Sequence, residues 1–85
     1  MQFEHIDVST YSGFKAGERP VSFIWREQPY RIQEIIDRWY EGGLKTGDPS
    51  LSYFKIRADN GREYLIRYNS FFDGWAIVIP PQPAA

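Results

Sequence analysis

The chain of 85 residues contains no cysteine and one histidine, His5. Disulfides and thiolate metal sites are therefore excluded, and so is a zinc site built from several histidines. We expect no metal and no other cofactor. A domain this small, without such help, has to be held together by dense packing. Aromatic residues make up 18% of the chain and supply large side chains for a core.

The chain also lacks an excess of charge of either sign. Ten lysines and arginines face eleven aspartates and glutamates, which gives a net charge of −1 and a pI near 5.7. Proteins that hold duplex nucleic acid by its phosphates usually carry a basic excess. Bulk electrostatic attraction to nucleic acid is therefore excluded, while a local basic patch stays open.

Long apolar runs are missing as well. The longest one near either end, residues 75–81, is far shorter than the roughly 20 residues of a membrane-spanning helix. The first residues lack the basic and apolar regions of a secretion signal. We expect a cytoplasmic protein without membrane contact.

Sequence motifs of catalysis are not found: there is no phosphate-binding loop, zinc-protease motif, nucleophile elbow or calcium loop. Asp59 and Asp73 are explained as turn residues, and His5 as a surface residue near the chain end. We therefore expect no catalytic residues and no enzymatic activity.

The clearest signal that is present is a β-hairpin. Two alternating runs, 53–58 and 62–68, flank the Asp-Asn-Gly sequence that ends at Gly61. A two-residue turn would mix apolar and charged groups on one face. A three-residue loop with left-handed Gly61 separates them. It predicts three cross-strand pairs: Phe54 with Ile66, Ile56 with Tyr64, and Arg57 with Glu63.

Segment 29–41 fits two structures. As a helix, its apolar residues follow the i, i+3, i+4, i+7, i+8 spacing, Pro29 suits the first turn, and two glycines follow the segment. As a strand, it is rich in isoleucine, tyrosine and tryptophan and would form a hairpin with residues 20–25. Periodicity alone favours the helix.

Aromatic and turn residues recur at a characteristic spacing: Phe23 to Trp25, Tyr30 to Ile32, Glu34 to Ile36, Trp39, Tyr53 and Phe54, Asn60 and Gly61, and Gly74 and Trp75. In these positions, residues 20–79 resemble a family of small bacterial domains of unknown function, some of them encoded beside or fused to translesion-type DNA polymerases. The resemblance implies a compact, mostly β architecture in which the stretch matching 30–39 is a strand. It carries over no catalytic residue, and it decides our choice for segment 29–41 in favour of the strand.

We predict one β-rich domain, residues 1–79, and a flexible proline-rich tail, 80–85. The fold class is mostly β, a small antiparallel barrel or rolled sheet of five to six strands. The alternative is an α+β fold with helix 29–41 packed on a four-stranded sheet. The expected strands are 2–8, 20–26, 30–39, 52–58, 62–68 and 75–79. The expected core is Val21, Phe23, Trp25, Ile32, Ile36, Phe54, Ile56, Tyr64, Ile66, Trp75 and Ile77.

A candidate binding face combines arginine with aromatic residues, which are the side chains that anchor protein partners and also stack on single-stranded bases. Its members are Arg57, Arg67, Tyr53, Trp39, Phe71 and Phe72. The plainer explanation is a solvated sheet face with cross-strand ion pairs, and Phe71 and Phe72 tucked beneath their loop.

The leading functional hypothesis is a non-catalytic protein-interaction or adaptor module that binds a protein partner or itself. Binding of single-stranded nucleic acid ranks second, and a small enzyme third.

Overall fold

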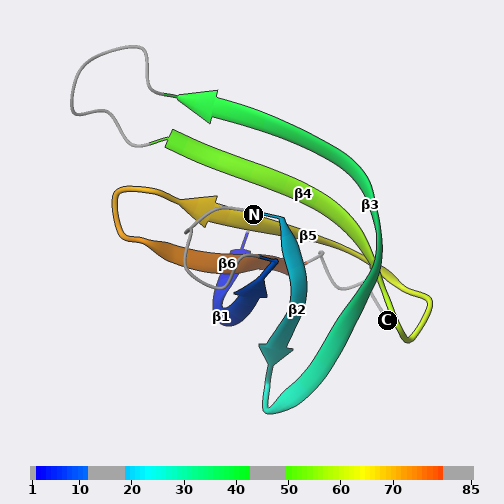
Figure 1. Cartoon of the computed structure of the whole chain (residues 1–85). Helices are drawn as coiled ribbons and strands as arrows, with labels where there is room; N and C mark the ends of the chain where they lie inside the picture. The colour runs from blue at the N-terminus through cyan, green and yellow to red at the C-terminus, as the bar shows by residue number, and fades with distance from the viewer. Residues whose placement is uncertain (1, 12–18, 43–49, 80–85) are drawn as a thin grey trace, which may run out of the picture.

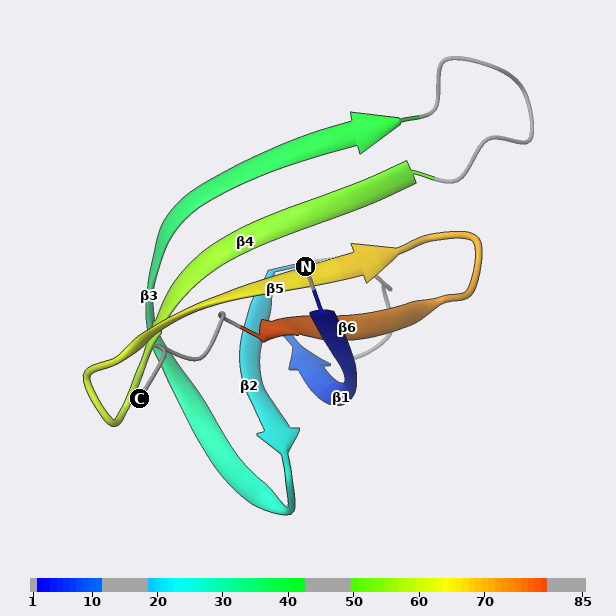
Figure 2. The same cartoon turned by 180° about the vertical axis from the view of Figure 1, so that it is seen from behind.

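Six antiparallel strands close into a barrel in the computed structural model, which describes residues 2–11, 19–42 and 50–79. Each strand pairs with the next in the sequence, and the first closes on the last (Figure 1; Figure 2 shows the back). The strands are β1 (Gln2–Thr10), β2 (Pro20–Trp25), β3 (Gln28–Gly42), β4 (Ser50–Ala58), β5 (Glu63–Asn69) and β6 (Gly74–Ile79). The described residues contain no helix, so the predicted small β-barrel is confirmed and the α+β alternative is wrong. The predicted tail, 80–85, lies outside the described residues.

Two long strands close the barrel because each is shared by two sheets. The first half of β1 pairs with β6, and its second half, from Asp7, pairs with β2. Likewise, Gln28–Arg31 of β3 pairs with β2, and the remainder of β3, from Ile32, pairs with β4. Both views show β3 and β4 curving together away from the barrel's lower end (Figures 1 and 2).

The β4–β5 hairpin has the predicted register. Phe54 pairs with Ile66, Ile56 with Tyr64 and Arg57 with Glu63. Gly61 has a φ of +81°, the left-handed conformation that glycine adopts at low cost. Its N–H donates to the Ala58 carbonyl over 2.9 Å.

Strand β3 explains why helical periodicity was misleading. Its pairing with β4 is interrupted between Ile32 and Glu34 and again between Ile35 and Asp37. Each bulge inserts one residue and shifts the alternation of side chains. Ile32 and Ile35 therefore both pack against the core although they lie three residues apart. Ile36, predicted to be core, is instead an inserted residue and is 37% exposed.

The core fills the barrel with side chains from five of the six strands. Its buried members are Ile6, Phe23, Phe54, Ile56, Ala58, Ile66, Tyr68, Trp75 and Ile77. Of the predicted core, Trp25, Ile32 and Tyr64 are half-buried and pack against this cluster, and Val21 is also half-buried. The aromatic side chains form two clusters: the rings of Phe23, Trp25, Tyr30 and Tyr64 contact one another, and so do those of Phe54, Tyr68 and Trp75.

A polar contact ties β1 to the β2–β3 turn. Glu4 accepts hydrogen bonds from Trp25 Nε1 over 2.8 Å and from an Arg26 Nη over 2.6 Å. The hydrogen bond from Arg26, followed by that from Trp25, holds the pKa of Glu4 below its ordinary value. Arg26 and the next residue, Glu27, both have positive φ, +52° and +66°. This two-residue turn thus holds two ordinary side chains in a conformation that favours glycine.

Candidate functional site

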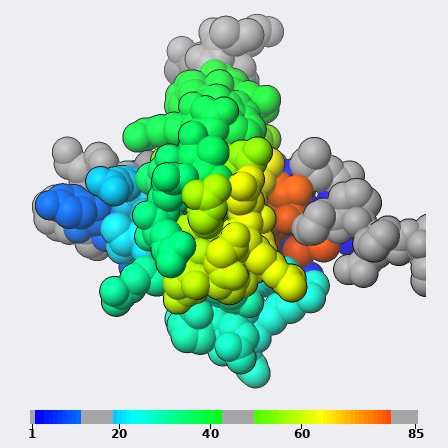
Figure 3. All heavy atoms as spheres, turned by 90° about the vertical axis from the view of Figure 1, so that its right-hand side faces the viewer, coloured from blue at the N-terminus to red at the C-terminus, as the bar shows by residue number. Residues whose placement is uncertain are grey.

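The outer side of the sheet formed by β3, β4, β5 and β6 brings three of the predicted site residues together. Trp39 pairs with Tyr53, and Tyr53 pairs in turn with Arg67. Because their neighbours Phe54 and Ile66 are fully buried, alternation places Tyr53 and Arg67 on the outside. Figure 3 shows this part of the surface obliquely, with β3 in green, the β4–β5 hairpin in yellow and β6 in orange beyond it.

Trp39 and Tyr53 form a cross-strand aromatic stack. Their ring centroids are 5.3 Å apart and the ring planes differ by 6°. Each ring therefore covers part of one face of the other. Trp39 remains 38% exposed, a large fraction for a tryptophan on a small barrel.

Arg67 continues this row toward β1. Its guanidinium lies 3.9 Å from the ring centroid of Phe3. The residue paired with Arg67 on β6 is Ala76, whose small side chain leaves space for this crossing. Within the described part of the chain, the buried Nε of Arg67 has no hydrogen-bond partner. A buried donor without a partner typically costs about 1–3 kcal/mol.

Apolar side chains lie next to this row. Leu65 and Val78 line one open hollow together with Arg62, Glu63 and Tyr64. A second hollow, also lined by Leu65, extends to Trp39 and Lys55. We name the set Phe3, Trp39, Tyr53, Leu65, Arg67 and Val78 the aromatic face.

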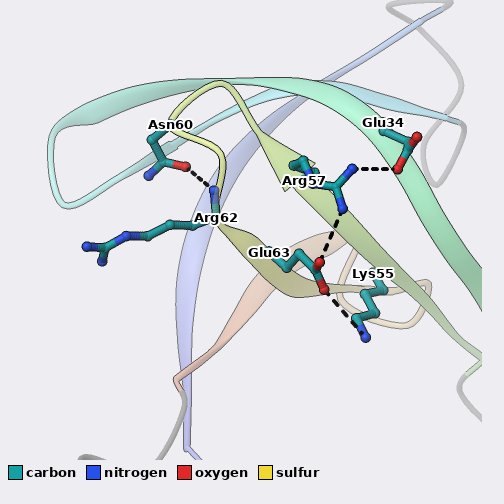
Figure 4. A network of polar contacts seen from close by, with 6 residues as sticks. All are labelled: Glu34, Lys55, Arg57, Asn60, Arg62 and Glu63. Carbon is teal, nitrogen blue, oxygen red and sulfur yellow. Dashed lines mark hydrogen bonds and ion pairs between the residues drawn. The ribbon is translucent and has the colours of Figure 1, made fainter.

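Arg57 lies on the same outer side but is held by carboxylates (Figure 4). Its two Nη atoms donate to Glu34 over 2.9 Å and to Glu63 over 3.3 Å, and Lys55 lies 3.6 Å from the other oxygen of Glu63. Asn60 Oδ1 accepts from the backbone N–H of Arg62 in the adjacent loop, over 2.9 Å. The expectation of cross-strand ion pairs is thus confirmed for Arg57, whose charge is compensated.

Phe71 and Phe72 lie in the β5–β6 turn, beyond the aromatic face. The expectation that both tuck beneath their loop is wrong: Phe71 is 67% and Phe72 74% exposed. Among the described residues, the Phe71 and Phe72 rings contact only each other, with their centroids 5.0 Å apart. The physical reason is the turn itself, because Asn69 Oδ1 accepts from both backbone N–H groups, over 2.9 and 3.4 Å, and fixes the turn outside the core.

Phe3, Leu65 and Val78 were missed as site residues. Leu65 could have been found from the hairpin register, which places it between Lys55 and the β6 strand on the outer side. Phe3 and Val78 pair with each other only because β1 closes on β6. No local pattern in the sequence signals a contact across 75 residues.

Two further ionisable pairs have structural explanations. His5 Nε2 lies 3.9 Å from Asp7 at the surface. Tyr68 donates to Asp73 over 2.6 Å, and burial followed by this bond raises the pKa of Tyr68 to about 12. In residues 2–11, 19–42 and 50–79, no three histidine or carboxylate side chains gather to hold a metal ion, and no helix is long and apolar enough to cross a membrane.

No family model matches the chain, and no significant match was found among curated proteins or solved structures. The aromatic face is therefore interpreted from its own chemistry.

Proposed function

We propose that this chain is a non-catalytic protein-interaction module whose partner packs on the aromatic face. The observation that carries the proposal is a row of Trp39, Tyr53, Arg67 and Phe3 across the outer side of the sheet, beside Leu65 and Val78. Tryptophan, tyrosine and arginine are the residues most enriched at the energetic centres of protein interfaces. A contiguous apolar patch with a polar rim is typical of such interfaces.

The rim charges favour a protein partner over nucleic acid. Lys55 and Arg57 are paired with Glu34 and Glu63, so two of the cations nearest the face are already neutralised. Phosphate binding depends on cations that release counterions, and here they would first have to leave a carboxylate. Asp37, which pairs with Lys55 across β3 and β4, adds another negative charge on this side of the sheet.

The aromatic stack favours the same conclusion. Domains that bind single strands offer open ring faces on which bases stack. Trp39 and Tyr53 already cover part of one face of each other. A protein partner needs only their edges and remaining faces, together with the aliphatic surface of Leu65.

The non-catalytic part of the proposal is supported by the roles of the shifted groups. Glu4, Arg26 and Tyr68 are the described residues whose pKa values depart from the ordinary ones, and each is explained by a contact that joins strands or a turn. Perturbed groups at active sites usually gather in one cleft. We place the module in the cytoplasm of a bacterium, in line with the cysteine-free sequence and the resemblance described above.

Site-specific photo-cross-linking in the native host tests the proposal. A benzoylphenylalanine replaces Leu65 on the aromatic face, and a control replaces Ile24, which is 50% exposed on β2. We expect a discrete protein adduct from position 65, absent from position 24 and lost when Tyr53→Ser is added. The purified partner should then bind the wild-type chain and not the Tyr53→Ser variant. A nuclease-sensitive adduct, or equal adducts from both positions, would contradict the proposal.

The partner on the aromatic face can also be a second copy of the chain. Sedimentation of the purified chain measures this self-association directly. A dimer that dissociates in the Tyr53→Ser variant identifies the partner as the same chain, and a monomer at all concentrations leaves a different protein as the partner.

A further inference from the structure

Among the described residues, Arg67 is the one arginine with a buried Nε that has no hydrogen-bond partner, whereas Arg31, Arg38 and Arg62 are exposed. Arg57 donates to two glutamates, and Arg26 donates to Glu4. In the described ranges, the one contact recorded for the Arg67 guanidinium is the ring of Phe3. Its Nε is also shut off from water. Native proteins rarely leave a buried donor unpaired, and such a group calls for a specific explanation.

The surroundings of Arg67 determine which acceptor would suit it. Leu65 and Ala76 are its neighbours along β5 and across to β6, and Tyr53 is its partner on β4. No carboxylate of the described chain reaches it. A guanidinium in apolar surroundings forms its strongest contacts with a planar, doubly accepting anion, because its fork matches a carboxylate in two parallel hydrogen bonds.

We infer that Arg67 is the specificity anchor of the aromatic face and that it binds a carboxylate of the partner. This inference rests on the proposed function and names the partner's chemistry: a segment with one aspartate or glutamate beside apolar side chains. The carboxylate accepts from the Arg67 guanidinium, which shifts off Phe3 far enough to open its Nε. The neighbouring apolar side chains of the segment fill the hollow lined by Leu65 and Val78.

A polyanion would fit this place less well than a single carboxylate. Arg67 is one cation without a carboxylate partner, Lys55 and Arg57 are already paired with Glu63 and Glu34, and Asp37 adds a negative charge on the same outer side. A nucleic-acid backbone would bring several phosphates close to these carboxylates. One carboxylate can meet Arg67 alone.

Selection from a displayed library of random twelve-residue peptides, with the whole chain as bait, tests the inference. Arg67→Gln removes the charge and the fork, and Arg67→Lys keeps the charge but removes Nε and the fork. Arg31→Gln is the matched control, because Arg31 is exposed on β3 opposite Ser22, away from the aromatic face. Melting temperatures show that all three variants are folded.

We expect the selected peptides to share one acidic residue flanked by apolar residues. Their affinity should fall at least tenfold for Arg67→Gln and for Arg67→Lys, and stay within twofold for Arg31→Gln. Changing the shared acid to its amide should cost a similar factor in the wild type and little in Arg67→Gln. This pattern would establish a direct pair between the two groups.

Three results would overturn the inference. Peptides without an acid whose binding is lost in Tyr53→Ser would leave the protein-binding face in place but refute the carboxylate. Peptides that bind Tyr53→Ser as well as the wild type, or no enrichment at all, would contradict both the inference and the proposed function. Binding of an oligothymidylate that weakens in Arg67→Gln would assign the arginine to nucleic acid.

Discussion

Replacing Arg67 by methionine should make the barrel more stable while it removes the partner's anchor. The variant deletes the buried Nε that has no acceptor, which relieves about 1–3 kcal/mol. It loses the contact of the guanidinium with Phe3, worth about 0.5–1 kcal/mol at a partly exposed site. Methionine keeps a flexible apolar chain that can lie on Phe3 and over Ala76. The net change is a stabilisation of about 1 kcal/mol.

Urea unfolding followed by tryptophan fluorescence measures this change, and the melting temperature of a domain of this size should rise by roughly 4–8 °C. Arg57→Met is the control on the same outer side. It removes two exposed ion pairs, to Glu34 and Glu63, and should lower stability by about 0–1 kcal/mol. A loss of stability in Arg67→Met equal to that in Arg57→Met would refute the reasoning, because Arg67 would then be a structural residue. Stability gained with binding lost is the usual mark of a residue kept for function.

Three further predictions concern the frame of the barrel. Glu27→Gly should raise the free energy of unfolding in urea by about 0.5–1 kcal/mol. Glycine removes the strain of a side chain at a left-handed φ of +66°, and this gain exceeds the entropy cost of glycine. A destabilised variant would show that the turn is not strained. Asp37 lies on the half of β3 that pairs with β4 but not with β2, so one edge of this half has no strand partner among the described residues, and its carboxylate accepts from the Arg38 N–H over 2.8 Å. Asp37→Ala removes this charge from the open edge, and sedimentation should then reveal concentration-dependent association through it. An unchanged monomer would contradict the protective role of Asp37. Because the pKa of Tyr68 is raised to about 12, the folded chain retains a proton that the unfolded chain loses near pH 10, so stability should be full below pH 10 and fall as the pH rises toward 12. Tyr68→Phe should lack this part of the fall between pH 10 and 12, and equal slopes would disprove the link.

Local patterns were sufficient to predict the β4–β5 hairpin. The glycine at position 61 and the requirement that Arg57 face Glu63 leave one register, and the structure has it. The information lies within 16 residues, so no distant contact is needed to decide it. The same holds for the buried side chains of these two strands.

The structure of β3 could not be predicted from its own sequence alone. Two bulges change the spacing of its inward residues from two to three, which imitates one face of a helix. Only the partner strand decides where a bulge occurs, because the inserted residue is defined by what it fails to pair with. Periodicity therefore favoured the wrong element, and the resemblance favoured the right one.

The candidate site was predictable in part. Trp39, Tyr53 and Arg67 were selected as residue types, and pairing across β3, β4 and β5 brings them into one row. Phe3 joins them only because β1 closes on β6. The charge of Arg57 is compensated by Glu34 on β3, the segment that the sequence alone did not assign to helix or strand. Long-range pairing determined both outcomes.

The three tryptophans provide the most direct test of the proposed interface. Their indole N–H groups give separate signals in an amide correlation spectrum of the labelled chain, and Trp39→Phe assigns one of them. Trp39 lies on the aromatic face, Trp25 donates to Glu4, and Trp75 is buried in the core. When the cross-linked partner or a selected peptide is added, the Trp39 signal should move in proportion to the bound fraction while the other two stay in place. A Trp39 signal that stays fixed at saturation would contradict the assignment of the aromatic face as the binding surface.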